Sequence, residues 1–268
     1  MKQEGKIIGI VSIKGGVGKT SCTANLGAAL ATEFNKDVLM IDANFSAPNL
    51  GIHVGVIEPD ITIHDVMKGK TKVKDAIINH EHGFDIIPAS LLYKKIDHNK
   101  LKQKIQHLKK SYDFILIDSS PNMKDEMIAT ILAADEILII TSPDYPTLST
   151  TLMAVKLANQ KNTPVIGIIV NRVKKRRYEL TVDEIERTVE IPVLGVLPED
   201  TNVAKSIAET VPVILYQPKS KAAVEFKKIA ACIAGEEFKD PRLWHRVKAK
   251  FKQKPKEEVN RVLYKNGI

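Results

Sequence analysis

The chain has 268 residues, 44% of them hydrophobic and 27% charged, and this composition excludes disorder along most of its length. Its two cysteines, Cys22 and Cys232, lie far apart in the sequence, which excludes a disulfide scaffold and a cysteine-rich zinc or iron–sulfur site. The net charge of +8 is concentrated in residues 241–256, which hold seven basic residues and no acid. This distribution favours a terminal segment with an anionic partner of its own over a nucleic-acid-binding body.

Short aliphatic runs alternate with helical patterns through the first 235 residues. The runs predicted as strands are Ile7–Ile13, Val38–Ile41, Phe84–Ile87, Phe114–Ile117, Ile137–Ile140, Val165–Val170 and Val193–Leu197. The segments predicted as helices are Thr20–Phe34, Leu101–Leu108, Met127–Ala134, Leu148–Ala158, Val182–Val189 and Lys219–Ala234. Such alternation predicts an α/β domain with a mostly parallel, twisted sheet and helices on both faces. We expect this single domain to span residues 1–235, because Gly235 suits the end of the last helix, and a basic amphipathic tail to span residues 236–268.

A glycine-rich loop, Ser12-Ile13-Lys14-Gly15-Gly16-Val17-Gly18-Lys19-Thr20, connects the first predicted strand to the first predicted helix. The backbone N–H groups of such a loop can surround phosphate oxygens, and the helix N-terminus adds a favourable dipole. Lys19 is placed to reach the β- and γ-phosphates, and the Thr20 hydroxyl suits Mg²⁺. The strict pattern has glycine where this chain has Ile13, and the chain adds a second lysine, Lys14. The loop therefore predicts a phosphate-binding site.

This loop, following a buried strand, resembles that of the deviant Walker A ATPases of the MinD/ParA family. Further segments resemble family motifs in the same order: Met40–Leu50 the first switch, Asp113–Pro121 the Walker B strand and second switch, and Val170–Arg172 and Leu197–Asp200 the adenine-contact loops. The resemblance is greater to the MinD branch than to the partition ATPases. It rests there on Pro48-Asn49-Leu50, on Pro198-Glu199-Asp200 and on the basic tail. A single P-loop NTPase domain is the fold that it implies.

The resemblance also implies which residues hold ATP and Mg²⁺. The positions that match the family's nucleotide-binding residues are Lys14, Gly15, Gly16, Val17, Gly18, Lys19, Thr20, Ser21, Asn171, Arg172, Pro198, Glu199 and Asp200. Thr20 would bind Mg²⁺ directly, and Asp118 would anchor a metal-bound water. Lys14 would reach across a nucleotide-sandwich homodimer to the phosphates of the other subunit, where its charge would stabilise the transition state. ATP would then control dimerisation.

The first switch departs from the family pattern at a catalytic position. The family normally has two aspartates one residue apart, and here the pair is Asp42 and Asn44. With Lys14, these are the residues expected to act in catalysis. An asparagine cannot act as a base, but its amide can orient water, and phosphoryl transfer depends mainly on positioning and charge stabilisation. We therefore expect an ATPase that hydrolyses ATP slowly.

The tail contains one strongly amphipathic segment. Leu243, Trp244, Val247 and Phe251 fall within one arc of a helix at about 100° per residue, with basic residues around the rest. Such a helix is typical of segments that lie on an anionic membrane surface. Two other interpretations stay open: the apolar arc packs on the domain or on a protein partner, or the charge binds nucleic acid. Two tails on an ATP-bound dimer would bind a membrane together and be retained longer than one.

Two further segments carry alternatives of their own. Lys174-Lys175-Arg176-Arg177 lies on a predicted loop, where it is either solvated or a contact for an acidic activator or for DNA. Beyond Pro255, the residues Val259, Val262, Leu263 and Tyr264 form a second short amphipathic stretch, which leaves open that the tail folds against the domain.

The function expected from these features is that of a switch. The N-terminal apolar run is short and ends in glycines, so we expect neither a signal peptide nor a membrane span. We expect a cytoplasmic protein that binds the inner face of the cell membrane reversibly, and whose ATP-dependent homodimer positions other machinery, such as that of cell division, with an activator or cargo protein. The alternatives are a ParA-type partition ATPase that binds DNA and a regulatory scaffold that binds ATP but hardly hydrolyses it.

Overall fold

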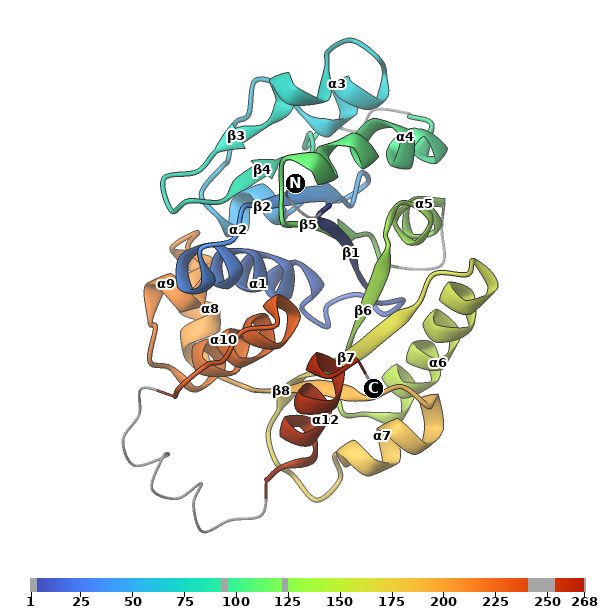
Figure 1. Cartoon of the computed structure of the whole chain (residues 1–268), viewed down its shortest axis with the longest axis vertical. Helices are drawn as coiled ribbons and strands as arrows, with labels where there is room; N and C mark the ends of the chain where they lie inside the picture. Colours follow the sequence, from blue (N-terminus) through green and yellow to red (C-terminus); the bar gives the residue numbers. More distant parts are fainter. Residues whose placement is uncertain (1–3, 93–95, 122–124, 241–253, 268) are drawn as a thin grey trace.

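The computed structural model of the chain describes residues 4–92, 96–121, 125–240 and 254–267. Within these ranges an eight-stranded sheet forms the centre of the molecule, in the order β3-β4-β2-β5-β1-β6-β7-β8 (Figure 1). β3 and β4 pair antiparallel, and the other neighbours pair in parallel. The strands are β1 (Lys6–Val11), β2 (Val38–Ala43), β3 (Ile78–Asn79), β4 (Asp85–Ile87), β5 (Phe114–Ser119), β6 (Glu136–Thr141), β7 (Val165–Val173) and β8 (Val193–Pro198). The mostly parallel sheet predicted from the sequence is confirmed.

Helices cover both faces of the sheet, which is also as predicted (Figure 1). One face carries α1 (Lys19–Phe34), α2 (Leu50–His53), α8 (Thr201–Ala208), α9 (Val213–Tyr216) and α10 (Lys221–Ala234). The other face carries α3 (Ile63–Met67), α4 (Leu101–Ile105), α5 (Asp125–Ala133), α6 (Tyr145–Gln160) and α7 (Val182–Val189). Three 3₁₀ turns complete the described elements before residue 241: η1 (Val73–Ala76), η2 (His98–Lys100) and η3 (Gln106–Lys110).

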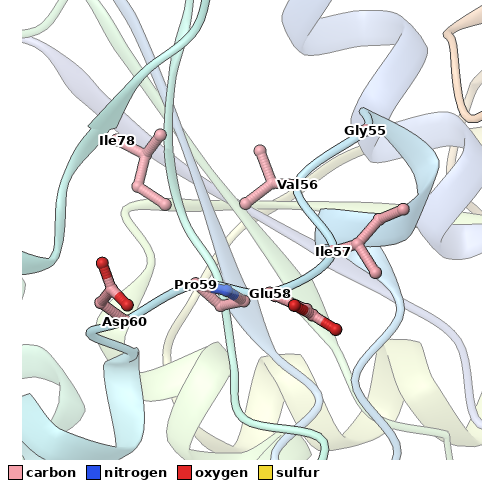
Figure 2. Close-up of a pocket in the computed structure, with 7 residues that line it drawn as sticks. All are labelled: Gly55, Val56, Ile57, Glu58, Pro59, Asp60 and Ile78. Carbon is pink, nitrogen blue, oxygen red and sulfur yellow. The ribbon is translucent and has the colours of Figure 1, made fainter.

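An open hollow lies at the β3 edge of the sheet. It is lined by residues 55–60 and by Ile78 of β3, and Ile57 there is 53% exposed (Figure 2). None of the site residues expected from the sequence lines this hollow.

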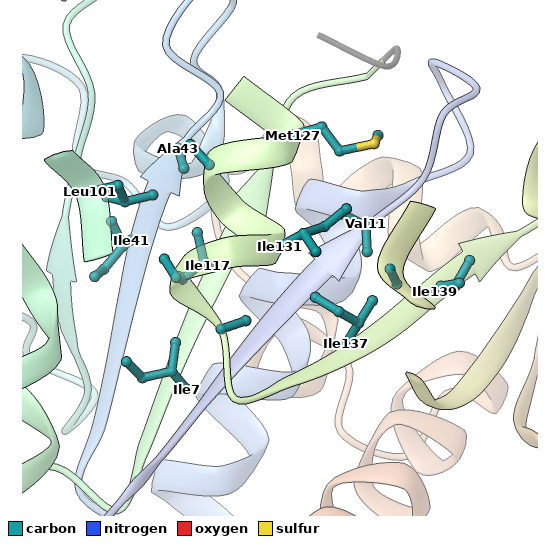
Figure 3. Close-up of a cluster of buried hydrophobic side chains, with 14 of the residues drawn as sticks. Ile7, Val11, Ile41, Ala43, Leu101, Ile117, Met127, Ile131, Ile137 and Ile139 are labelled. Carbon is teal, nitrogen blue, oxygen red and sulfur yellow. The ribbon is translucent and has the colours of Figure 1, made fainter. Parts of the chain in front are cut away.

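Successive side chains of β1 point alternately to the two faces of the sheet. Ile7 and Val11 point to the layer that holds α5, where they meet Ile117, Ile131 and other aliphatic side chains (Figure 3). Ile8 and Ile10 point to the opposite layer, against α1 and α10. Because successive side chains of a strand point to opposite faces, a run of aliphatic residues indicates a strand buried on both sides. The central strands hold the loops at their carboxyl ends in fixed positions.

Element boundaries differ from the expectation in places, for local reasons. α6 starts at Tyr145 and not at Leu148, because the Asp144 side chain accepts a hydrogen bond from the Thr147 backbone N–H at 2.9 Å and so caps the helix earlier. The helix expected over Leu101–Leu108 changes from α4 to the 3₁₀ turn η3 at Gln106. α10 ends as predicted, with Gly235 at a φ of 70°.

A last helix, α12 (Lys256–Lys265), packs on β8 and α10. β8 is one edge of the sheet, and no other strand of the described residues pairs with its outward side. Asn260 Nδ2 donates to the Val193 carbonyl at 2.9 Å, and Arg261 donates to the Leu194 carbonyl at 2.9 Å. The second amphipathic stretch is therefore held on the domain, and its buried side includes two polar residues.

The apolar side chains of α12 do not all face the domain. Tyr264 packs against the core, whereas Val259, Val262 and Leu263 are 44%, 49% and 40% exposed. The first amphipathic segment, with Leu243, Trp244, Val247 and Phe251, lies outside the described residues. Among the helices of the described residues, none has the length and apolar character that a membrane span requires.

Candidate functional site

The glycine-rich loop joins β1 to α1 and is shaped by two glycines. Gly16 and Gly18 have φ values of 74° and 95°, which other residues rarely adopt. A side chain at Gly18 would also place its Cβ 2.3 Å from Asn171 Nδ2. Asn171, near the end of β7, donates to the Val17 carbonyl at 2.8 Å. The loop is thus fixed from the side by a neighbouring strand, and the N-terminus of α1 opens towards it.

Lys19, Thr20 and Asp118 form the polar centre of the site, in which Lys19 and Asp118 are buried and Thr20 is partly buried. The Thr20 hydroxyl donates to Asp118 Oδ2 at 2.7 Å, and the Thr23 hydroxyl donates to Asp118 Oδ1 at 3.3 Å. Burial lowers the pKa of Lys19, while the Asp118 charge opposes that change. Burial also raises the pKa of Asp118, against the hydrogen bond from Thr20 and the charge of Lys19. A cation and an anion thus stand together in a poorly solvated place at the start of α1.

Asp42 lies beside Asp118, because β2 and β5 pair in register at these two residues. Its carboxylate accepts three backbone N–H bonds, from Asn44 at 3.0 Å, Asn49 at 3.1 Å and Leu50 at 3.0 Å. Burial and the neighbouring Asp118 charge raise the pKa of Asp42. Asp42 therefore organises residues 44–50, the segment that corresponds to the expected first switch, and it adds a second carboxylate to the buried centre.

Asn44 is folded back onto its own loop. Its Nδ2 donates to the Ala47 carbonyl at 2.5 Å, which leaves Oδ1 buried and without a hydrogen-bond partner among the described residues. The hydroxyl of Ser120, the residue after β5, is also buried and without a hydrogen-bond partner among the described residues. Buried polar atoms are nearly always satisfied, so two such atoms in the segments that follow β2 and β5 mark a place suited to a further polar group.

Lys14 is the exposed basic group of the loop. Its ammonium donates to Thr147 Oγ1 at 2.7 Å and lies 3.3 Å from Asp144 Oδ1. Burial opposes ionisation of Asp144, but hydrogen bonds from Ser142, Thr147 and Lys14 outweigh it and lower the pKa of Asp144 to about 2. Lys14 is therefore held at the start of α6, away from the buried centre.

Seven of the residues expected to bind the cofactor line one cavity of about 210 Å³, whereas residues 14–17, Lys19 and Thr20 do not line it. Gly18, Ser21, Asn171 and Arg172 form one side, and residues 198–200 form another. Lys174 Nζ lies 3.2 Å from Glu199 Oε1 at the rim. Asp200 caps α8 by accepting from the Asn202 backbone N–H at 3.0 Å. The structure thus brings together segments that are separated by about half of the chain.

Comparison with known proteins identifies the family. The profile of the CobQ/CobB/MinD/ParA nucleotide binding domain matches residues 8–213. The chain belongs to this family. An uncharacterised ATP-binding protein of Methanocaldococcus jannaschii is 36% identical over 234 residues, which are 86% of this chain and 88% of that protein.

Two solved structures of the family are similar over most of their length. The cell division ATPase MinD of Pyrococcus furiosus superposes with a TM-score of 0.83 at 34% identity, covering 86% of this chain and 98% of that one. The septum site-determining protein MinD of Pyrococcus horikoshii, solved in complex with Mg-ADP, gives a TM-score of 0.82 at 33% identity, covering 85% of this chain and 95% of that one. The predicted resemblance to MinD/ParA ATPases is confirmed.

Sequence reasoning missed two parts of this family member's site. The first is the apolar wall of the cavity, made by Val203, Ala204, Ile207, Ala222 and Phe226 from α8 and α10. The spacing of Val203 and Ile207 would have indicated it, had a helix been predicted after Asp200. The second is the contact of Lys14 with Asp144 and Thr147. No sequence signal connects Lys14 to residues that lie so far along the chain.

Proposed function

We propose that the protein binds ATP with Mg²⁺ in the cavity beside the glycine-rich loop. The observation that carries this proposal is that buried Lys19 and partly buried Thr20, at the N-terminus of α1, meet the buried Asp118 of β5. A buried lysine beside a helix N-terminus supplies the positive field that triphosphate oxygens need. The adjoining cavity has apolar side chains on α8 and α10 to pack on a base and polar groups on its rim. Membership of a nucleotide-binding family supports the same conclusion.

The donor set fits Mg²⁺. The described residues contain no group of three or more His, Cys, Asp or Glu side chains arranged for a metal ion, and the oxygen donors here are a hydroxyl and a carboxylate. Mg²⁺ prefers oxygen ligands, keeps several waters and takes few protein ligands beside phosphates. Thr20 would hold the ion directly and Asp118 through water. When bound, Mg²⁺ would neutralise charge on the phosphates during transfer.

Hydrolysis would depend on Asn44 for the position of the attacking water. Its unpartnered Oδ1 can accept a hydrogen bond from water but cannot take a proton as a carboxylate can. Asp42 keeps the switch segment in place through its three backbone bonds. The rate should be slow, because positioning without a base supplies only part of the usual catalysis.

Lys14 would make ATP a dimerisation signal. It is half-exposed, and Asp144 and Thr147 hold it in the single chain. In a dimer that closes over the loop, Lys14 would leave this resting place for the phosphates of the partner subunit. The exchange replaces one carboxylate by several phosphate oxygens, so ATP would favour it more than ADP.

The dimer would then bind an anionic membrane through two tails. Leu243, Trp244, Val247 and Phe251 support this interpretation by sequence pattern alone. Co-sedimentation with vesicles that contain anionic lipid, with MgATP or MgADP, tests it: binding with ATP and little with ADP is expected, weakened by salt and by Trp244→Glu. Equal binding with both nucleotides, or none with either, would remove the membrane switch. Reversible membrane association and positioning of division or other machinery are the roles we propose.

A DNA-binding partition ATPase is the second candidate, and one observation favours it. Residues 174–178 are exposed, and the Glu179 carboxylate accepts from the backbone N–H groups of Lys174 and Arg176, which leaves four basic side chains outside the turn. Salt-sensitive binding of duplex DNA that persists without residues 241–268 and is lost in Arg176→Glu/Arg177→Glu would support this candidate. Unchanged DNA binding in the double variant would exclude the loop as the contact.

A further inference from the structure

His53, the last residue of α2, connects the switch segment to the glycine-rich loop. Its Nδ1 lies 2.9 Å from the Asn49 carbonyl oxygen, and its Nε2 lies 3.2 Å from the Ser21 hydroxyl oxygen. Ser21 is the third residue of α1, directly after Lys19 and Thr20. The His53 imidazole therefore connects the start of α1 to the switch segment, and the expected nucleotide would contact both of these segments as well.

The two hydrogen bonds decide where the protons are. A carbonyl oxygen only accepts, so Nδ1 must carry the hydrogen that is donated to Asn49. Burial lowers the pKa of His53, against the hydrogen bond to Asn49, so the ring is neutral near pH 7. In a neutral imidazole with a hydrogen on Nδ1, Nε2 is an acceptor. The Ser21 hydroxyl therefore donates its single hydrogen to His53.

The same hydroxyl lines the cavity in which the nucleotide is expected. Phosphate oxygens are acceptors, so a phosphate beside Ser21 needs the hydroxyl hydrogen that Ser21 donates to His53. We propose that His53 is a positioning residue that competes with the nucleotide phosphate for the Ser21 hydroxyl, so that nucleotide binding releases the end of α2. This inference rests on the proposed nucleotide site and adds a connection between its occupancy and the switch segment.

The release would act on one end of α2 only. At the other end the Asp42 carboxylate accepts from the backbone N–H groups of Asn49 and Leu50. Breaking the bond between Ser21 and His53 would leave α2 attached at its N-terminus and would free the His53 side chain at its C-terminus, while the neighbouring Val54 carbonyl keeps its bond to His80 Nε2. The switch segment would thus respond to the presence of a phosphate before any dimer forms.

The test measures ADP affinity of the full chain by calorimetry in the presence of Mg²⁺. In His53→Leu, and in His53→Phe should the first variant fold poorly, Ser21 has no competing acceptor, so ADP should bind about 2- to 10-fold tighter than in the wild type. His80→Leu is the matched control, because His80 Nε2 contacts the Val54 carbonyl at 2.7 Å, next to His53, without contact to Ser21. The control should leave the affinity within about 2-fold.

Hydrogen exchange over residues 49–56 provides a second readout. In the wild type, ADP should increase amide exchange there, whereas in the His53 variants exchange should be high already and insensitive to ADP. A His53 variant that binds ADP as the wild type does, or more weakly, overturns the inference, and so does wild-type exchange that falls with ADP. A wild-type chain that binds no ADP overturns the proposed nucleotide site itself, which is a different result.

Discussion

Two regions of the molecule bury polar side chains, and they do so differently. Under α12, Asn260 and Arg261 donate to the carbonyls of the edge strand β8, and Arg261 also lies 3.8 Å from Glu225. At the carboxyl ends of β2 and β5, two carboxylates stand side by side with raised pKa values, and the Asn44 and Ser120 oxygens have no partner among the described residues. The Asn260 and Arg261 donors are therefore satisfied within the chain, whereas Asn44 Oδ1 and the Ser120 hydroxyl are not.

The difference separates a structural role from a functional one. Buried polar groups that are fully paired stabilise one arrangement, whereas unpaired or mutually repelling groups cost stability and persist where a ligand completes them. α12 is therefore understood as a cover for an exposed strand edge. The ends of β2 and β5 are understood as a site that phosphate, Mg²⁺ and water would complete.

The largest effect is expected from Lys19→Ala. The phosphates would lose the cation at the start of α1, so affinity for MgADP and MgATP should fall by about 100-fold or more, as calorimetry would measure. Lys36→Ala, which removes a partly exposed lysine paired with Glu236 just beyond the other end of α1, is the control and should change neither affinity. Retained affinity in Lys19→Ala would place the nucleotide somewhere else.

Substitutions under α12 should lower the stability of the fold and leave nucleotide binding unchanged. Arg261→Ala removes the donor to the buried Leu194 carbonyl, while Glu225 and Glu258 keep their ion pairs with Lys228. The free energy of unfolding should therefore fall by about 1–3 kcal/mol, while nucleotide affinity stays the same. Lys256→Ala, on the same helix, removes an ammonium that is itself exposed and pairs with Asp183 and Glu186, so it should cost clearly less than Arg261→Ala. Denaturant titration measures both, and equal losses would contradict the role given to the buried pair.

Asn44→Asp tests the site at the ends of β2 and β5, because it replaces a side-chain amide by a carboxylate of nearly the same shape. A carboxylate at this position can orient water and accept its proton, so the rate of ATP hydrolysis should rise by about 10-fold or more, measured as phosphate release under saturating ATP. Asn49→Asp, whose side chain contacts the same Ala47 carbonyl, is the control. An unchanged rate in Asn44→Asp would mean that Asn44 does not position the attacking water.

A smaller effect concerns pH. The folded chain lowers the pKa of His53 below its ordinary value of 6.5, so the unfolded chain takes up a proton first as pH falls. The stability from the neutral ring is complete well above pH 6.5 and is lost progressively below it. Between about pH 7 and pH 5, the wild type should therefore lose more unfolding free energy than His53→Phe. The difference isolates His53, because all other titrating groups are shared, and parallel profiles would contradict the assignment.

The sequence predicted the sheet and the loop because both are local patterns. Aliphatic runs indicate buried strands, and a loop such as Gly15–Thr20 after a strand indicates phosphate binding without knowledge of the rest of the fold. The partners of those residues were not predictable. Asp144 meets Lys14, and His53 meets Ser21, only because parallel strands bring their loops to one edge.

The tail illustrates a second limit of sequence patterns. The spacing of Val259, Val262 and Leu263 correctly indicates a helix but not which side is buried. Asn260 and Arg261 take the buried side because the carbonyls of an edge strand need donors, and that need exists only in the assembled sheet. The periodicity of the sequence indicates an amphipathic helix, but packing in the assembled domain decides which side of that helix is buried.

The central claim is that ATP closes two chains into a dimer through Lys14. Sedimentation velocity of the full chain with MgATP and with MgADP tests it most directly, beside the Lys14→Ala variant. We expect a dimer with ATP, a monomer with ADP, and a monomer with either nucleotide in Lys14→Ala, which should still bind ATP within about 2-fold of the wild type. The same mass with both nucleotides in the wild type, or an ATP dimer that persists in Lys14→Ala, would contradict the account.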